Sequence, residues 1–171
     1  LSIRKEGNTP AWGAVYEQYF QEIDKVKGQK GVLSVEKKLF VETNNGTNRQ
    51  IRPVTPEQPL RIGDKVIVRL TIRTDREMNY VFLKDLRAGC FEPADQLSGP
   101  ESRDGIWYYR SPKDVSENFF INRLPEGTFV LEYPVYVSRS GEYAGGISTI
   151  QCMYAPEFVS HTAGESLRIM P

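Results

Sequence analysis

The chain has 171 residues, enough for one domain with a sizeable hydrophobic core. Its 22 Lys and Arg residues balance its 22 Asp and Glu residues, so no net charge favours nucleic acid or an anionic membrane, and neither partner is expected. Aromatic residues make up 11% of the chain, which argues against disorder, and no apolar run is long enough to cross a bilayer.

The N-terminal end divides into a linker, an aromatic stretch and a connection. Residues 1–10 are polar and are interpreted as a linker from an upstream domain, which leaves residues 11–171 as a single β-sandwich domain. Residues 21–31 are charged and end in Gly-Gln-Lys-Gly, a composition typical of a connection.

Residues 11–20 (AWGAVYEQYF) are predicted as the first strand. Their aromatic side chains, a valine and a glycine favour β structure, and Trp12 and Tyr16 fall on one face of a strand. A helix is the alternative, because Trp12, Tyr16, Tyr19 and Phe20 also share one helical face.

The middle of the chain contains the clearest strand. In residues 65–73, small and branched apolar side chains alternate with charged or polar ones at period two. The side chains predicted to face inward are Val66, Val68, Leu70 and Ile72, and those predicted to face water are Lys65, Arg69, Thr71 and Arg73. Before it, residues 32–42 are predicted as a strand followed by a turn at Asn44, Asn45 and Gly46, and residues 49–52 as a short pairing segment.

The stretch 79–99 begins as a strand with apolar residues on both faces and then stops in an ordered corner. Gly89 and Pro93 supply turn chemistry there, since Gly accepts positive φ and Pro fixes φ. Residues 100–105 are predicted as a loop, and Pro134 inside a predicted strand indicates an edge or a bulge. Further strands are predicted at residues 106–110, 117–124, 128–138, 147–154 and 166–170, with a loop at 161–164.

These segments add up to about nine strands at the spacing typical of two packed antiparallel sheets. No alternation of strands and helices indicates a parallel sheet. The predicted fold is therefore an all-β antiparallel sandwich with at most one short helix.

Residues that could carry catalysis are few. His161 is the only histidine and is predicted to lie on a surface loop, where the adjacent Ser160 cannot supply the geometry of a catalytic triad. No Cys/His cluster or calcium-loop motif is present, so neither a metal nor another cofactor is expected. Several carboxylates are interpreted as ordinary surface charges: Asp75, Glu77, Asp85, Glu92, Asp95, Asp104 and Asp114.

The aromatic run Trp107, Tyr108 and Tyr109 is the candidate contact site, for a ligand or for a neighbouring domain. Three adjacent aromatic residues could form a platform for a sugar, but the simpler interpretation packs alternate members into the core. The cysteines Cys90 and Cys152 are predicted to be two reduced thiols, with Cys152 buried and Cys90 nearer the surface.

Several segments in collinear order resemble one protein family. They are KKLFVE at residues 37–42, LRIGDKVIVRLTIRTDREMNYVFLKDLRAGCFEP at 60–93, NFFINRLPEGTFVLEYPVYVSRSGEY at 118–143 and TIQCMYAPEF at 149–158. Together they resemble the C-terminal macroglobulin-type (MG10-like, receptor-binding-domain-like) domain of bacterial α2-macroglobulin-like proteins, in particular the large versions of Bacteroidetes. In this resemblance WGAVYEQYF at residues 12–20 matches the opening strand of the domain.

The resemblance implies a non-catalytic structural and interaction domain at the end of a longer, exported chain that is periplasmic or lies at the cell surface. Whole proteins of the family trap proteases, and many use an internal thioester with the motif C-x-E-Q. That motif is absent here, since Phe91 follows Cys90 and Met153 follows Cys152. The implied partners are the neighbouring domains and, for the whole protein, proteases. A free-standing sandwich that binds a carbohydrate or protein remains the alternative, because a fold alone does not fix a function.

Overall fold

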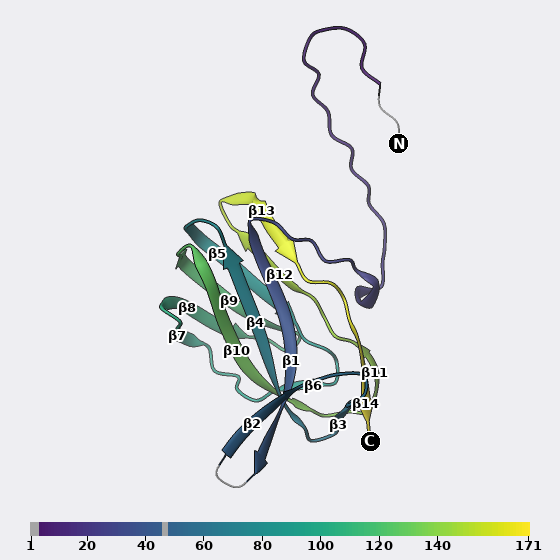
Figure 1. Cartoon of the computed structure of the whole chain (residues 1–171), viewed down its shortest axis with the longest axis vertical. Coiled ribbons are helices and arrows are strands. Elements are labelled where there is room, and N and C mark those ends of the chain that lie inside the picture. Colours follow the sequence, from purple (N-terminus) through teal and green to yellow (C-terminus); the bar gives the residue numbers. More distant parts are fainter. Residues whose placement is uncertain (1–3, 46–47) are drawn as a thin grey trace.

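The computed structural model describes residues 4–45 and 48–171 of an all-β chain (Figure 1). The described residues form one 3₁₀ turn and fourteen strands. In chain order the elements are η1 (Ile23–Lys25), β1 (Leu33–Asn45), β2 (Asn48–Pro53), β3 (Leu60–Arg61), β4 (Lys65–Thr74), β5 (Met78–Leu86), β6 (Phe91–Pro93), β7 (Gly99–Arg103), β8 (Ile106–Pro112), β9 (Ser116–Leu124), β10 (Gly127–Val137), β11 (Gly141–Ala144), β12 (Ser148–Cys152), β13 (Ala155–His161) and β14 (Ser166–Met170).

Two large sheets pack face to face and confirm the predicted sandwich. The five-stranded sheet has the order β2-β1-β4-β10-β6, and the six-stranded sheet has the order β13-β12-β5-β9-β8-β7. All pairs within these two sheets are antiparallel. A small third sheet, β11-β14-β3, contains a parallel pair between β14 and β3.

The described residues form more strands than the predicted nine. β2 covers the predicted short pairing segment and β3 has two residues, while β6, β7, β11 and β13 form where a corner, a loop or turns were predicted. Each of these four strands pairs with a single neighbour within its sheet. A strand of this kind depends on the partner that tertiary structure brings to it, and its own sequence need not alternate. Of the predicted turn, Asn44 and Asn45 lie in β1 and pair with Arg49 and Asn48 of β2, so they are not turn residues, and Gly46 lies outside the described part of the chain.

The core is built on β4, as its alternation predicted. Val66, Val68, Leu70 and Ile72 are buried and face the six-stranded sheet. β4 lies between β1 and β10, so its backbone is hydrogen-bonded on both sides. The opposite wall of the core comes from β5 and β9, where Leu83 lies opposite Phe119 and Val81 opposite Ile121.

Pro134 lies in β10 opposite Ile67 of β4. On the other side of β10, the short strand β6 pairs only with Val135, Tyr136 and Val137. Most of β10 is therefore an edge strand, the setting in which a proline without an N–H is tolerated. This part of the sequence prediction is confirmed.

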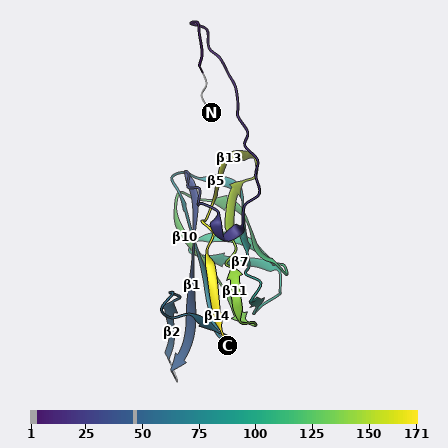
Figure 2. The same cartoon turned by 90° about the vertical axis from the view of Figure 1, so that its right-hand side faces the viewer.

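Residues 11–20 are not a strand of this sandwich, so the predicted opening strand is wrong. They form an extended segment whose side chains are all exposed, and the segment runs away from the two sheets in both views (Figures 1 and 2). The period-two pattern of aromatic residues correctly predicted an extended backbone, but not membership of a sheet. However, no sheet edge of the described residues lies beside this segment to pair with it.

Candidate functional site

The three predicted contact residues do not form one platform. They lie on β8, where alternation sends Trp107 and Tyr109 outward and Tyr108 inward. Trp107 is 71% exposed, Tyr109 48% and Tyr108 only 6%. The hydroxyl of Tyr108 donates to Glu101 at 2.9 Å, and burial together with this carboxylate raises the pKa of Tyr108 to about 12.

The outward residues of β8 continue into an aromatic surface across the six-stranded sheet. Tyr109 lies opposite Phe120 of β9, and Phe120 lies opposite Phe82 of β5. The rings of Phe82 and Phe120 stack with their centroids 4.9 Å apart. We call Phe82, Trp107, Tyr109 and Phe120 the outer aromatic face; sequence reasoning found its β8 half but missed the two phenylalanines, whose register with β8 cannot be read from spacing.

A second exposed aromatic pair lies where β5 begins. Tyr80 and Tyr154 meet edge to face, with their ring centroids 5.1 Å apart. Tyr80 has φ of 56°, a left-handed conformation that is unfavourable for a bulky side chain. It interrupts the pairing of β5 with β9 between Asn79 and Val81.

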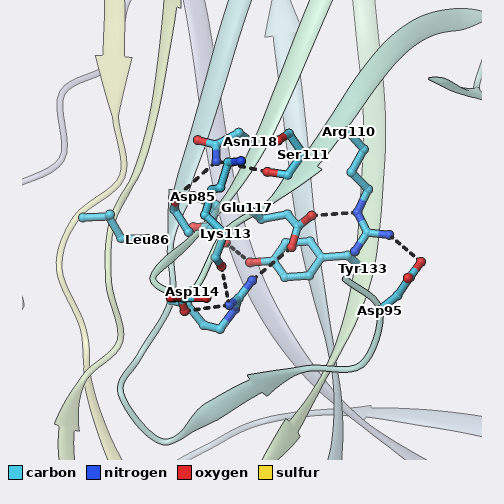
Figure 3. A network of polar contacts seen from close by, with 12 residues as sticks. Asp85, Leu86, Asp95, Arg110, Ser111, Lys113, Asp114, Glu117, Asn118 and Tyr133 are labelled. Atoms are coloured by element: carbon cyan, nitrogen blue, oxygen red, sulfur yellow. Dashed lines mark hydrogen bonds and ion pairs between the residues drawn. The ribbon is translucent and has the colours of Figure 1, made fainter. Parts of the chain in front are cut away.

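The inner side of the same sheet holds a network of buried charges (Figure 3). Its centre is a pair of carboxylates, Asp85 of β5 and Glu117 of β9, which lie directly opposite each other in the ladder and are fully buried. Like charges in such a cross-strand pair repel. Each carboxylate therefore needs its own set of donors.

Asp85 receives donors from three other strands. Lys37 of β1 donates to Asp85 Oδ1 at 2.8 Å and Ser148 of β12 donates to the same oxygen at 2.7 Å. The hydroxyl of Tyr133 on β10 donates to Asp85 Oδ2. Burial and the negative charge of Asp85 hold the pKa of Tyr133 well above its usual value, so this tyrosine stays a neutral donor. Lys37 and Tyr133 belong to the five-stranded sheet, so these bonds join the two layers.

Two arginines hold Glu117, Arg110 on the neighbouring strand β8 and Arg87 directly after β5. Arg110 Nε donates to Glu117 Oε1 at 2.7 Å, and Arg87 Nη2 donates to Oε2 at 3.1 Å. Burial raises the pKa of Glu117, and the two guanidinium groups oppose that rise. Arg87 Nη1 also donates to the carbonyl oxygens of Lys113 and Asp114, both at 2.9 Å, and so fixes the turn between β8 and β9.

The interpretation of Asp85 as a surface carboxylate is therefore wrong. It shares the inward face of β5 with Val81 and Leu83, just as Glu117 shares that of β9 with Phe119 and Ile121. Alternation alone was a usable signal that both carboxylates point into the core. Because both carboxylates are fully buried and each of their oxygens accepts from a side chain of another segment, the arrangement is suited to joining strands, and it is closed to solvent.

Of the other predicted carboxylates, Asp95 contacts Arg110 of the network at 3.5 Å, whereas the single histidine and the two cysteines are not part of either site. His161 ends β13 instead of lying on a loop, and its backbone pairs with Gln29. Both cysteines are free and buried; Cys90 is the more deeply buried, so its predicted place near the surface is wrong. Burial raises the pKa of the Cys90 thiol to about 11, since the corner turns its side chain into the core.

Two further features are absent from the described residues, a metal-binding cluster and a membrane-spanning helix. No group of three or more His, Cys, Asp and Glu side chains in this part of the chain could hold a metal ion. Among the same residues, no helix is long and apolar enough to cross a membrane.

Comparison with known families identifies the fold. The model of the bacterial α2-macroglobulin MG10 domain matches residues 33–157, from the start of β1 into β13. The chain therefore belongs to the family of bacterial α2-macroglobulin MG10 domains. The match begins after residues 11–20, in agreement with the separation of that segment from the sandwich.

Solved structures of bacterial α2-macroglobulins contain a similar fold. The Salmonella protein reacted with methylamine superimposes with a TM-score of 0.66 at 21% identity, over 85% of this chain and 10% of that one. A native Escherichia coli fragment spanning domain MG7 to the C-terminus gives 0.65 at 16% identity, over 84% of this chain and 24% of that one. The E. coli protein activated by porcine elastase gives 0.66 at 18% identity, over 85% and 14%.

One curated protein is also similar in sequence. The circularly permutated Ras protein 2 of Dictyostelium discoideum is 28% identical over 109 residues, which is 64% of this chain and 3% of that protein. The chain thus spans a small part of every relative described here, between 3% and 24% of its length.

Proposed function

We propose that this chain is a non-catalytic structural and interaction domain of a larger α2-macroglobulin-like protein that traps proteases. The observation that carries the proposal is the family match over residues 33–157 in a fold whose outer aromatic face is exposed. Exposed clusters of large apolar side chains mark protein contact sites. The E. coli relative that is activated by porcine elastase supports a response of the whole parent protein to a protease.

In this proposal the outer aromatic face packs against a neighbouring domain of the parent. The relatives are several times longer than this chain, so partner domains exist in the family. Trp107, Tyr109 and Phe120 supply large rigid surfaces at low entropic cost, as residues at the centre of interfaces do. The parent is further proposed to be an exported protein of the Bacteroidetes type, located in the periplasm or at the cell surface, with this domain near its C-terminal end.

The test compares the parent protein with the 171-residue chain. The parent should retain elastase in a stable complex, whereas the 171-residue chain should neither inhibit a panel of proteases nor hydrolyse their substrates. In the parent, Trp107→Ala combined with Phe120→Ala should weaken protease retention, and Glu126→Ala, an exposed turn variant, should leave it unchanged. Tight inhibition by the 171-residue chain alone, or no retention by the parent, would overturn the proposal.

A carbohydrate-binding module is the second candidate, favoured by the exposed Trp107 beside the half-exposed Tyr109. Sugar rings stack on such side chains because their C–H faces are apolar. A glycan array with the 171-residue chain separates the two candidates. Specific glycan binding that is lost in Trp107→Ala would favour the module, and an array without signal would favour the interdomain role.

A further inference from the structure

The segment of residues 11–20, the N-terminal arm, carries a pattern that the sandwich does not use. Trp12, Tyr16 and Phe20 fall on one side of an extended chain, and Val15 and Tyr19 fall on the other. Trp12 is 95% exposed, and the side chain of Phe20 is completely exposed. An aromatic side chain removes about 150–250 Å² from water when it is covered, so a segment with four of them exposed lacks a partner surface.

The backbone of the arm is also unpartnered. Residues 11–20 are extended, yet no backbone hydrogen bond joins them to any other described residue. Each face of the segment carries large apolar side chains and one polar one, Gln18 or Glu17, a pattern that suits a strand covered on both sides of its sheet over most of its length. A strand of this kind needs a sheet edge for its N–H and C=O groups and apolar layers for its side chains.

By contrast, the root of the arm is fixed firmly to the sandwich. Gly164 N–H donates to the carbonyl of Val26 at 2.8 Å, and Gln29 and His161 exchange two backbone bonds of 2.9 and 3.0 Å. A Cβ on Gly164 would lie 1.8 Å from the carbonyl oxygen of Ile23, so the close contact requires glycine. The arm is thus an unpaired segment, and the residues that follow it, Val26 and Gln29, anchor it to the sandwich near the end of β13.

This anchor limits where a partner can lie. Only Gln21 and Glu22 separate the arm from η1, so Phe20 stays within about 10 Å of Ile23. Inside its own domain, the nearest sheet edge is β13, where Gln29 pairs with the last residue, His161, and the arm makes no backbone hydrogen bond with the rest of that edge. The exposed edge of β7 lies at the opposite end of the six-stranded sheet from β13.

We propose that the N-terminal arm is a detached strand that adds to an open sheet edge of the preceding domain in the parent chain. This inference rests on the proposed function, because it requires a parent with a domain before this one. The partner is a β-domain that abuts the sandwich where β13 ends and offers an unpaired strand edge beside an apolar layer. The arm then joins two domains by main-chain pairing, with the aromatic side chains as anchors.

Hydrogen exchange of the arm amides tests the proposal directly. In the 171-residue chain these amides should exchange at the rate of an unstructured peptide. In the parent protein the same amides should exchange at least about a hundredfold more slowly, because hydrogen-bonded sheet amides exchange only when the sheet opens. Equal exchange of the arm in both proteins would overturn the proposal.

Proline variants of the parent test whether backbone hydrogen bonds protect the arm. Along a strand that pairs on one side, alternate N–H groups point toward the partner, so Val15→Pro and Tyr16→Pro together cover both directions. At least one of the two variants should abolish the protection of residues 11–20, while peptides from β4 keep theirs. Asn8→Pro lies outside the arm and should leave protection unchanged. Protection that survives in both Val15→Pro and Tyr16→Pro would contradict strand addition.

Two other outcomes would also contradict it. Protection of the arm in the 171-residue chain that is lost in a Trp107→Ala and Phe120→Ala variant would mean that the arm covers its own outer aromatic face. Protection that rises with protein concentration would mean that a second copy is the partner. Protease retention is measured separately, so a parent that protects its arm but retains no protease would refute the proposed function and leave the detached strand intact.

Discussion

β4 and β9 lie in opposite layers of the same sandwich and differ in the kinds of side chain that they bury and expose. Every inward side chain in the centre of β4 is aliphatic, and Arg69 and Arg73 point away from the core. In β9, a glutamate is fully buried and Phe120 is half exposed. The difference shows that strand register decides which way a side chain points, whereas the groups that neutralise a buried charge come from other segments of the chain.

The largest expected effect comes from removing the buried charge in β9. Glu117→Ala should lower the free energy of unfolding by about 3–5 kcal/mol, because Arg87 and Arg110 would be left buried without their counterion. Urea denaturation measures the change, and Glu126→Ala, in an exposed turn, should cost less than about 0.5 kcal/mol. If Glu117→Ala does not fold, Glu117→Gln serves the same purpose, and an unchanged midpoint in both variants would show that the network contributes nothing.

The matching experiment on β4 tests its aliphatic face. Leu70→Ala should cost about 2–5 kcal/mol, because the fully buried side chain leaves a cavity. Arg69→Ala should cost no more than about 1 kcal/mol, since its ion pair with Glu132 is partly solvated. Equal denaturation midpoints for the two variants would mean that the inward face of β4 is misassigned.

Tyr108 provides a test at alkaline pH. Its pKa is raised from 10.0 to about 12 in the folded chain, so the unfolded chain releases the phenolic proton first. Stability conferred by the neutral tyrosine is therefore complete below pH 10 and is lost as the pH rises towards 12, by at most about 2–3 kcal/mol. Tyr108→Phe should show a shallower loss of stability over this range, and an unchanged slope would contradict the burial of this hydroxyl.

The smallest expected effect is on the outer side of the six-stranded sheet. Trp107→Ala should change the free energy of unfolding by less than about 0.5 kcal/mol, because most of the indole is exposed to solvent. Thermal denaturation of the 171-residue chain measures it, with Leu70→Ala as the destabilised reference. A cost comparable with that of Leu70→Ala would mean that Trp107 stabilises the sandwich and is not available to a partner.

The strands of this fold that could be predicted are those whose own sequence pattern indicates a strand. β4 alternates cleanly, and β14 is short and follows a predicted loop. The predicted extents of both strands differ little from the observed ones. β7 and β13 could not be predicted, because they form on partners that are defined only by the fold. Residues 11–20 show the reverse case, in which a strand-like sequence has no partner within the described residues.

The candidate site was predictable to a similar degree. Alternation separates Tyr108 from Trp107 and Tyr109, and it also places Asp85 and Glu117 on inward faces. What spacing cannot supply is the identity of the groups that neutralise them. Lys37, Tyr133 and Ser148 approach Asp85 from sequence positions 48 or 63 residues away, and only the pairing of distant strands brings them together.

The same distances have a consequence for the order of folding. When β5 and β9 pair, their two carboxylates come face to face, but Lys37, Tyr133 and Ser148 reach Asp85 only when β1, β10 and β12 have joined the sandwich. Until the five-stranded sheet docks, the inward face of β5 is open and water solvates the Asp85 carboxylate. Docking removes that water and brings Lys37 and Tyr133 to Asp85 in the same step. A docking that displaces Lys37 or Tyr133 would bury the Asp85 charge without these donors, so we expect Asp85 to favour one arrangement of the two layers over others of similar apolar contact.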